Sequence, residues 1–189
     1  MTGFRVTHST RVTTVGFLSI EELVLEAPGG DVAHRVVVRH PGAVVVVPVV
    51  DDRSAALLVH QYRVATETEI LEVPAGKRDV DGEAPAVTAA RELEEEIGFV
   101  PGRLVKLAEF YNTPGFCDEY THLYAALDLV DTEGPAPTSL DEKHMVVEQI
   151  ALADIEMRIA GRRLIDAKSI IGLLLARAYL AGEYPGIDE

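Results

Sequence analysis

The stretch Gly76–Phe99, GKRDVDGEAPAVTAARELEEEIGF, decides how the fold of this chain is interpreted. An α-helix makes one turn in about 3.6 residues, so residues three or four apart share one face. The small and apolar residues with that spacing are Ala86, Ala89, Ala90, Leu93 and Ile97. The pattern predicts an amphipathic helix, and Gly98 after it is typical of a helix C-cap.

The same helix carries a dense group of carboxylates beside its apolar face. Glu92 and Glu96 are four residues apart and Glu95 is three after Glu92, so all three lie on a neighbouring stripe. Like charges at this spacing repel and do not stabilise a purely structural helix. A divalent cation turns the repulsion into coordination, and carboxylate oxygens suit Mg²⁺ or Mn²⁺. We therefore expect a metal site here, the alternative being a solvated face such as Glu94 occupies.

The spacing around this helix resembles the Nudix box, usually written G-x5-E-x7-R-E-U-x-E-E-x-G-U, where U is a bulky apolar residue. The matching residues are Gly76, Glu83, Arg91, Glu92, Leu93, Glu95, Glu96, Gly98 and Phe99. Six residues rather than five separate Gly76 from Glu83. The additional residue falls in the loop before the helix, where insertions are tolerated, so the role of Glu83 stays open.

The resemblance to the Nudix family covers about Gly42 to the C-terminus and implies an α/β/α sandwich with a mixed β-sheet. The residue pattern agrees with this α/β class. Ala43–Val50 is a continuous apolar run, typical of a buried strand, and further strands flank the acidic helix. Asp166 is placed to cap a closing apolar helix from Ala167 to about Ala181.

The segment before this region reads as a small antiparallel sheet. Residues 12–17, 21–26 and 32–39 are β-rich, and Pro28-Gly29-Gly30-Asp31 is a strong turn signal. We predict an N-terminal β-sheet subdomain over residues 1–41 and a Nudix hydrolase domain over 42–189. A small sheet has open edges and little core of its own, so we expect it to pack on a second subunit in a homodimer.

Composition limits the classes of function. The net charge of −14 argues against a nucleic-acid-binding protein, because no basic surface would offset phosphate repulsion. The apolar runs are too short to span a bilayer, and the N-terminus lacks the apolar core of a signal peptide. The single Cys117 rules out an internal disulfide and fits a reducing compartment. We therefore expect a cytoplasmic protein that binds neither nucleic acid nor membrane.

Residues outside the box resemble the ADP-ribose pyrophosphatase subfamily. Pro114 lies sixteen residues after Gly98, the offset that marks this subfamily, and Gln61–Arg63 and Leu71–Gly76 are also similar to it. The resemblance implies metal-dependent hydrolysis of ADP-ribose to AMP and ribose 5-phosphate. It also implies a dimer whose subunits exchange their N-terminal sheets.

The resemblance assigns roles around the box. Metal ligands are expected at Glu92, Glu96, Glu95 and the carbonyl of Ala75. Arg91 is expected to position these carboxylates, and it counts with Glu95 and Glu142 among the catalytic residues. In this subfamily the general base lies on a loop well after the box, and the matching position is Glu142, directly after the acidic segment 130–141, which is predicted to be mobile. The alternative for Glu142 is an ordinary solvated loop residue.

The substrate contacts also follow from the resemblance. Arg63 and Arg35 match arginines that hold the phosphates and the ribose. Glu119 is expected to bond the terminal ribose from the loop that begins near Pro114, and Phe17 to stack on the adenine. For each arginine a plain surface charge is the alternative.

Three rival functions remain open at this point. The same chemistry can act on another nucleoside diphosphate derivative, such as GDP-mannose or FAD. A catalytically silent Nudix domain that binds ADP-ribose is the rival from another class, although such domains usually lose box glutamates and this chain keeps them. A pure oligomer-forming scaffold would not explain the clustered carboxylates.

Overall fold

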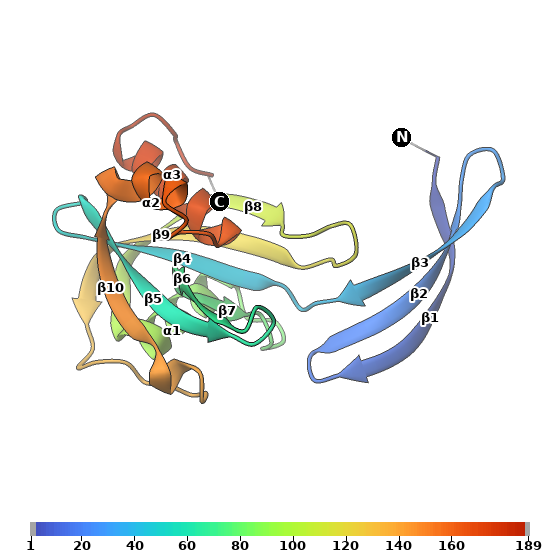
Figure 1. Ribbon diagram of the computed structural model, residues 1–189, viewed down its shortest axis with the longest axis horizontal. Coiled ribbons are helices and arrows are strands. Elements are labelled where there is room, and N and C mark those ends of the chain that lie inside the picture. Colours follow the sequence, from blue (N-terminus) through green and yellow to red (C-terminus); the bar gives the residue numbers. More distant parts are fainter. Residues whose placement is uncertain (1–2, 188–189) are drawn as a thin grey trace. The chain divides into compact units, whose positions relative to one another are not determined.

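The computed structural model describes residues 3–187 and divides into two compact units. The first contains the residues up to Gly42 together with Phe110–Thr121. The second contains Ala43–Glu109 and the residues from His122 onward. Each unit is built around its own sheet (Figure 1).

The first unit is an antiparallel sheet with the order β1-β2-β3. Its strands are β1 (Arg5–Val15), β2 (Leu18–Glu26) and β3 (Val32–Arg39). Every residue of β1 is exposed, whereas Leu23 on β2 is buried. The sheet therefore has little core of its own, as expected from the sequence.

The loop that begins at Asn112 is hydrogen-bonded to the last strand of this sheet. Val38 N donates to the carbonyl of Phe116 over 2.7 Å, and Asp118 N donates to the carbonyl of Val38 over 3.2 Å. The Asp118 carboxylate also accepts a bond from Arg39 over 3.0 Å. The sequence alone did not connect this loop with the N-terminal strands.

The second unit holds a mixed seven-stranded sheet with the order β10-β5-β4-β9-β8, in which β6 pairs with β5 and β7 with β4. The strands are β4 (Ala43–Val50), β5 (Ala55–Arg63), β6 (Thr68–Glu72), β7 (Ala75–Lys77), β8 (Phe99–Tyr111), β9 (Tyr120–Asp131) and β10 (Val146–Ala151). The helices are α1 (Pro85–Ile97), α2 (Ile155–Ala160) and α3 (Ala167–Leu180), with single 3₁₀ turns η1 (Glu142–His144) and η2 (Leu152–Asp154).

Helices cover both faces of this sheet, which confirms the predicted α/β/α class (Figure 1). Successive side chains of a strand point to opposite faces. Val44 and Val46 of β4 belong to the core cluster that contains Ala89 and Leu93 of α1. Val47 lies on the opposite face of the sheet, against α3. A Cβ atom built on Gly172 of α3 would stand 2.9 Å from Val47 Cγ2.

The predicted ends of two helices are confirmed. Gly98 closes α1 in a left-handed conformation with φ 75°, and its N–H donates to the Glu94 carbonyl over 3.0 Å. Asp166 caps α3, where its carboxylate accepts the N–H of Ser169 over 2.8 Å. No helix within residues 3–187 is long and apolar enough to cross a membrane.

Candidate active site on helix α1

Helix α1 buries two carboxylates together with its apolar side chains. Pro85 fills its first turn, where a missing N–H costs nothing. Glu92 is 8% exposed and Glu96 is 5% exposed, and each is followed in the chain by a buried core residue. Glu94 is exposed, as predicted for the one glutamate of the group that faces solvent. Buried charge is expensive unless it is compensated, so this pair needs a physical reason.

Strand β7 passes directly over these two carboxylates. The Ala75 N–H donates to Glu96 Oε2 over 3.3 Å. A Cβ atom built on Gly76 would stand 1.8 Å from Cδ of Glu92 and 2.2 Å from its Oε1. Only glycine therefore allows the backbone of β7 to approach the Glu92 side chain this closely.

Arg91 holds the remaining charges of the helix together. Its NH1 lies 2.9 Å from Glu92 Oε1 and 3.2 Å from Glu95 Oε2. Its NH2 lies 3.5 Å from Glu83 Oε2. Glu83 therefore reaches the same guanidinium in spite of the inserted residue, and Arg91 contacts carboxylates as predicted.

The pKa values of the two buried carboxylates are raised. Burial raises the pKa of Glu92 to about 7, with Arg91 opposing and Glu95 and Glu142 contributing in the same direction as burial. Burial also raises the pKa of Glu96 well above its ordinary value, and the neighbouring Glu92 adds to the effect. At both carboxylates burial and like charge thus outweigh the nearby positive charge, which Arg91 supplies for Glu92 and Arg63 for Glu96.

This environment fits a hard divalent cation. Glu92 and Glu96 offer carboxylate oxygens from one helix face, and a cation there would supply the missing positive charge. Across residues 3–187 no group of three or more His, Cys, Asp or Glu side chains converges on one point suited to a metal. Glu95 is turned to Arg91, with distances of 3.2 and 3.3 Å, rather than toward Glu96.

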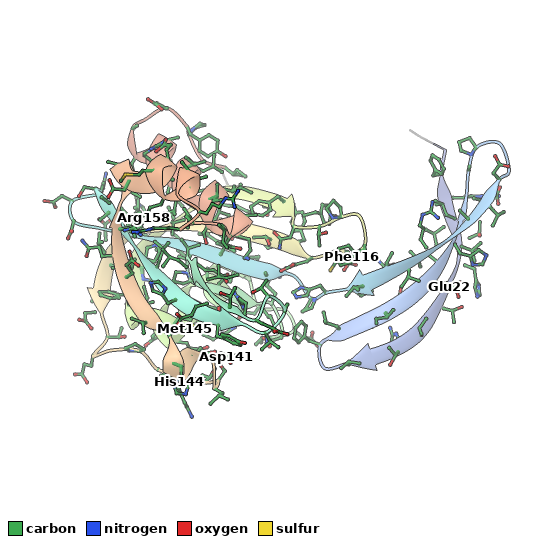
Figure 2. The ribbon with its side chains drawn as sticks, in the orientation of Figure 1. Glu22, Phe116, Asp141, His144, Met145 and Arg158 are labelled. Atoms are coloured by element: carbon green, nitrogen blue, oxygen red, sulfur yellow. The ribbon has the colours of Figure 1, made fainter. Side chains whose placement is uncertain are left out.

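Glu142 lies within electrostatic range of this pair but is held by its own loop. Its carboxylate accepts the Ser139 hydroxyl over 2.7 Å and the Ser139 N–H over 3.1 Å, and Thr138 donates to it as well. Burial raises the pKa of Glu142, but these donors outweigh burial and lower it overall. Figure 2 shows its neighbours Asp141, His144 and Met145 on the segment that leads into β10.

Arg63 forms a bidentate ion pair in the second unit. Its Nε and NH2 donate to the two oxygens of Glu72, each over 2.7 Å. Glu72 is 2% exposed, and Lys168 lies 3.7 Å from it. Glu72 was not predicted as a site residue, because no local motif indicates an ion pair that joins two strands at positions not directly opposite; Glu72 stands opposite Val59.

The other predicted substrate contacts all belong to the first unit. Arg35 is exposed on β3 and donates to the carbonyl of His34. Phe17 packs edge-on against His40 with the ring centres 5.3 Å apart. Pro114 is exposed in its loop, and the carbonyl of Glu119 accepts the N–H of Asn112 over 3.2 Å.

Sequence reasoning did not single out the network around Arg78. Arg78 NH2 donates to the carbonyl of Glu83 over 3.3 Å, and NH1 lies 3.4 Å from Nε2 of His122. The other ring nitrogen of His122 lies 2.7 Å from Glu109 Oε1. The position of Arg78, two residues after Gly76, is the only sequence signal that could have indicated it.

Comparison with known proteins agrees with this geometry. The chain is 40% identical to the ADP-ribose pyrophosphatase of Bacillus subtilis over 146 residues. The matched residues cover 77% of each of the two chains. It is 32% identical over 179 residues to the ADP-ribose pyrophosphatase of Mycobacterium tuberculosis, covering 95% of this chain and 86% of the relative.

A solved structure described as an ADP compounds hydrolase superposes with a TM-score of 0.83 at 25% identity and covers 95% of both chains. The model of the NUDIX domain matches residues 39–168, which include the whole of α1 and the loop that carries Glu142. These residues form the larger part of the chain. The chain therefore belongs to the Nudix family.

Proposed function

We propose that this protein hydrolyses the pyrophosphate of ADP-ribose to AMP and ribose 5-phosphate. The observation that carries the proposal is the pair of buried carboxylates, Glu92 and Glu96, beneath the backbone of Ala75 and Gly76. A site of this kind suits a divalent cation and a charged phosphate substrate rather than a purely structural helix. The names of the Bacillus and Mycobacterium relatives supply the substrate.

Nudix hydrolases generally use divalent metal ions. We propose Mg²⁺ or Mn²⁺, held by Glu92 and Glu96, with Glu95 as a third ligand and the Ala75 carbonyl as a fourth. When bound, such an ion neutralises charge on the pyrophosphate oxygens and favours ionisation of a water molecule. Arg91 positions Glu92 and Glu95, and its contact with Glu95 has to open if Glu95 is to become a ligand.

Glu142 is the proposed general base. Its lowered pKa keeps the carboxylate ionised at neutral pH, so it is able to accept the proton of the attacking water. Attack at phosphorus forms one P–O bond and breaks the bridging one, which leaves a phosphate on each product. The donors of Ser139 and Thr138 occupy this carboxylate, so the 138–142 loop has to release it as the substrate binds.

We propose roles in substrate recognition for the remaining residues that resemble the subfamily. Arg35, Phe17, Pro114 and Glu119 are proposed contacts for the ribose groups and the adenine, and Arg63 a contact for the phosphates. We also propose a homodimer formed through the N-terminal sheet. The exposed valines and the absence of buried residues along β1 support this proposal. The domain limits 1–41 and 42–189 and a cytoplasmic location belong to the same proposal.

The test is a substrate panel of ADP-ribose, GDP-mannose and FAD, each with Mg²⁺ or Mn²⁺, with release of the nucleoside monophosphate as the readout. We expect ADP-ribose to have the highest kcat/KM. Glu96→Gln should lose activity by about 1000-fold or more, and Glu142→Gln by about 100-fold. Glu94→Gln is the matched control because Glu94 is exposed on the same helix, and it should retain wild-type activity.

Three results would contradict parts of this proposal. A higher kcat/KM for GDP-mannose or FAD would leave the chemistry in place but change the substrate. A Glu142→Gln variant with wild-type activity would show that another residue is the general base, and Glu119 would be the next candidate. Binding of ADP-ribose without turnover of any substrate would identify a silent sensor domain.

A further inference from the structure

A cavity in the second unit is lined by three arginines. Its volume is about 380 Å³, within the range of small-molecule sites. It lies where β5, β6 and β10 meet the connection between α2 and α3. The lining residues are His60, Glu69, Ile70, Leu71, Glu148, Arg158, Arg162, Arg163 and Ile165.

This cavity is separate from the carboxylates of α1. Leu57 and Val59 of β5 pack in the core cluster of α1, and the next residue, His60, therefore points to the opposite face of the sheet. Glu148 pairs in register with Leu58, so its side chain lies on the same face as that of His60. Figure 2 shows Arg158 toward the end of β10 that lies away from Met145, the residue that adjoins the loop of Glu142.

One carboxylate holds two of the basic groups in place. Arg158 NH1 donates to Glu148 Oε1 over 2.7 Å, and His60 Nε2 lies 2.8 Å from Glu148 Oε2. Both oxygens of Glu148 are thus occupied within the wall of the cavity. Among the described residues, His60 and Arg158 are the partners of Glu148, and neither Arg162 nor Arg163 bonds to it.

Arg162 and Arg163 are the two other arginines of the cavity lining. Both are exposed, and neither side chain has a hydrogen bond or ion pair within residues 3–187. The carbonyls at the end of α2 bond to the backbone N–H groups of these two arginines and not to their side chains. The Arg158 carbonyl accepts the N–H of Arg163 over 2.9 Å, and the Ile159 carbonyl accepts that of Arg162 over 3.0 Å.

The local charge is opposite to that of the molecule. The chain carries a net charge of −14, yet the lining of this cavity has three arginines against two carboxylates, Glu69 and Glu148. A guanidinium presents parallel N–H donors that match a phosphate group, and it stays charged at all relevant pH values. Ile70, Leu71 and Ile165 provide an apolar wall for the uncharged part of a ligand.

We propose that this cavity is a second ligand site that binds a phosphomonoester, with Arg162 and Arg163 as its phosphate ligands. Arg158, fixed by Glu148, defines the third side of the anion site. Inorganic phosphate and a nucleoside monophosphate carry the same anionic group, and the experiment below distinguishes them. The proposal does not depend on the substrate assigned to α1.

The absence of tryptophan from the chain permits a local test. Ile165 lines the cavity and is 56% exposed, so Ile165→Trp places a single fluorophore at the site. The variant is titrated with inorganic phosphate and, separately, with AMP, at constant ionic strength and with EDTA present. A Val130→Trp reporter on β9 is the control, since Val130 is 58% exposed and outside the cavity.

We expect a saturable change in Ile165→Trp and none in Val130→Trp. Adding Arg162→Gln and Arg163→Gln to the Ile165→Trp background should weaken binding by about tenfold or more. Arg103→Gln removes one exposed charge from β8 and should change the affinity by less than about twofold. Equal affinities for the two ligands would indicate recognition of phosphate alone, whereas tighter binding of AMP would show that the apolar wall contributes.

Calorimetry with inorganic phosphate on the wild type and on the Arg162→Gln/Arg163→Gln variant covers the case in which the tryptophan disturbs folding. No saturable binding of either ligand would overturn the proposal, and so would equal affinity in the wild type and the double variant. These titrations involve no turnover, so a negative result would leave the hydrolysis proposed for α1 untouched.

Discussion

The backbone of Gly76 lies against the side chain of Glu92, with no room for even one additional carbon atom between them. A Cβ on Gly76 would stand 1.8 Å from Glu92 Cδ, whereas real Cβ atoms essentially never come within 3.0 Å of another atom. Arg91 NH1 lies 2.9 Å from Glu92 Oε1, so a carboxylate displaced by a Cβ at position 76 would also have to change this ion pair. This contact explains why a glycine begins the box.

Gly76→Ala should therefore displace a proposed metal ligand. We expect kcat/KM for ADP-ribose to fall by about 100-fold, equivalent to about 2.7 kcal/mol of lost transition-state stabilisation. Initial rates measure the effect, and thermal unfolding shows whether the fold is retained. Gly29→Ala is the matched control, since a Cβ there meets nothing within 4 Å. A variant with wild-type kcat/KM would show that Glu92 is not needed in this position.

Arg91→Lys should separate positioning from charge. The Arg91 guanidinium reaches Glu83, Glu92 and Glu95 at once, at 3.5, 2.9 and 3.2 Å. A lysine keeps the charge, but its single ammonium cannot span all three. We expect kcat to fall by about tenfold or more, because the carboxylates lose their common partner. Arg103→Lys, at an exposed position on β8, is the control, and equal rates for the two variants would contradict the assignment.

Gly98→Ala should destabilise the second unit through two additive causes. The residue has φ 75°, and a Cβ would stand 2.4 Å from the carbonyl carbon of Gly134. A left-handed non-glycine residue costs about 1–2 kcal/mol, and overpacking typically adds about 1–3 kcal/mol. Gly182→Ala provides the comparison, because Gly182 has φ 74° but open space around it.

Chemical unfolding measures both variants, and Gly98→Ala should lose clearly more free energy of unfolding than Gly182→Ala. Equal losses would mean that the segment at Gly134 moves away without cost. In that case the backbone conformation alone would account for the glycine at the end of α1.

Periodicity and local end signals were enough to predict the parts of the fold that depend on nearby residues. The apolar stripe of α1, its end at Gly98 and the cap at Asp166 each involve residues within one or two helical turns. The resemblance to the box implied that Arg91 contacts carboxylates, and it does. In these cases the sequence spacing and the three-dimensional contact are set by the same helical geometry.

Contacts between distant residues could not be predicted in the same way. The ion pair between Arg63 and Glu72 joins neighbouring strands at positions that are not directly opposite, since Arg63 pairs with Thr68 and Glu72 with Val59, and no local pattern specifies it. The association of Phe110–Thr121 with the N-terminal strands depends on the path of β8 and β9, which the order of elements does not determine.

The pH dependence of stability should reveal the cap of α3. The Asp166 carboxylate accepts the Ser169 N–H over 2.8 Å, the Ser169 hydroxyl over 2.7 Å and Lys168 Nζ over 2.7 Å. Burial raises the pKa of Asp166, but these partners outweigh burial and lower it below its ordinary value. Asp166→Ala should therefore cost about 1–2 kcal/mol of unfolding free energy at pH 7.

This loss should shrink in acid. A carboxylate whose pKa is lower in the folded state stabilises the fold fully above its unfolded-state pKa of about 3.9, and loses that contribution as the pH falls through the lower folded-state pKa. The difference in unfolding free energy between wild type and Asp166→Ala should hence be constant from neutral pH to about 5 and decline below about 4. Denaturant unfolding at several pH values measures it. A difference independent of pH would mean that the ionised carboxylate caps the helix no better than its neutral form does.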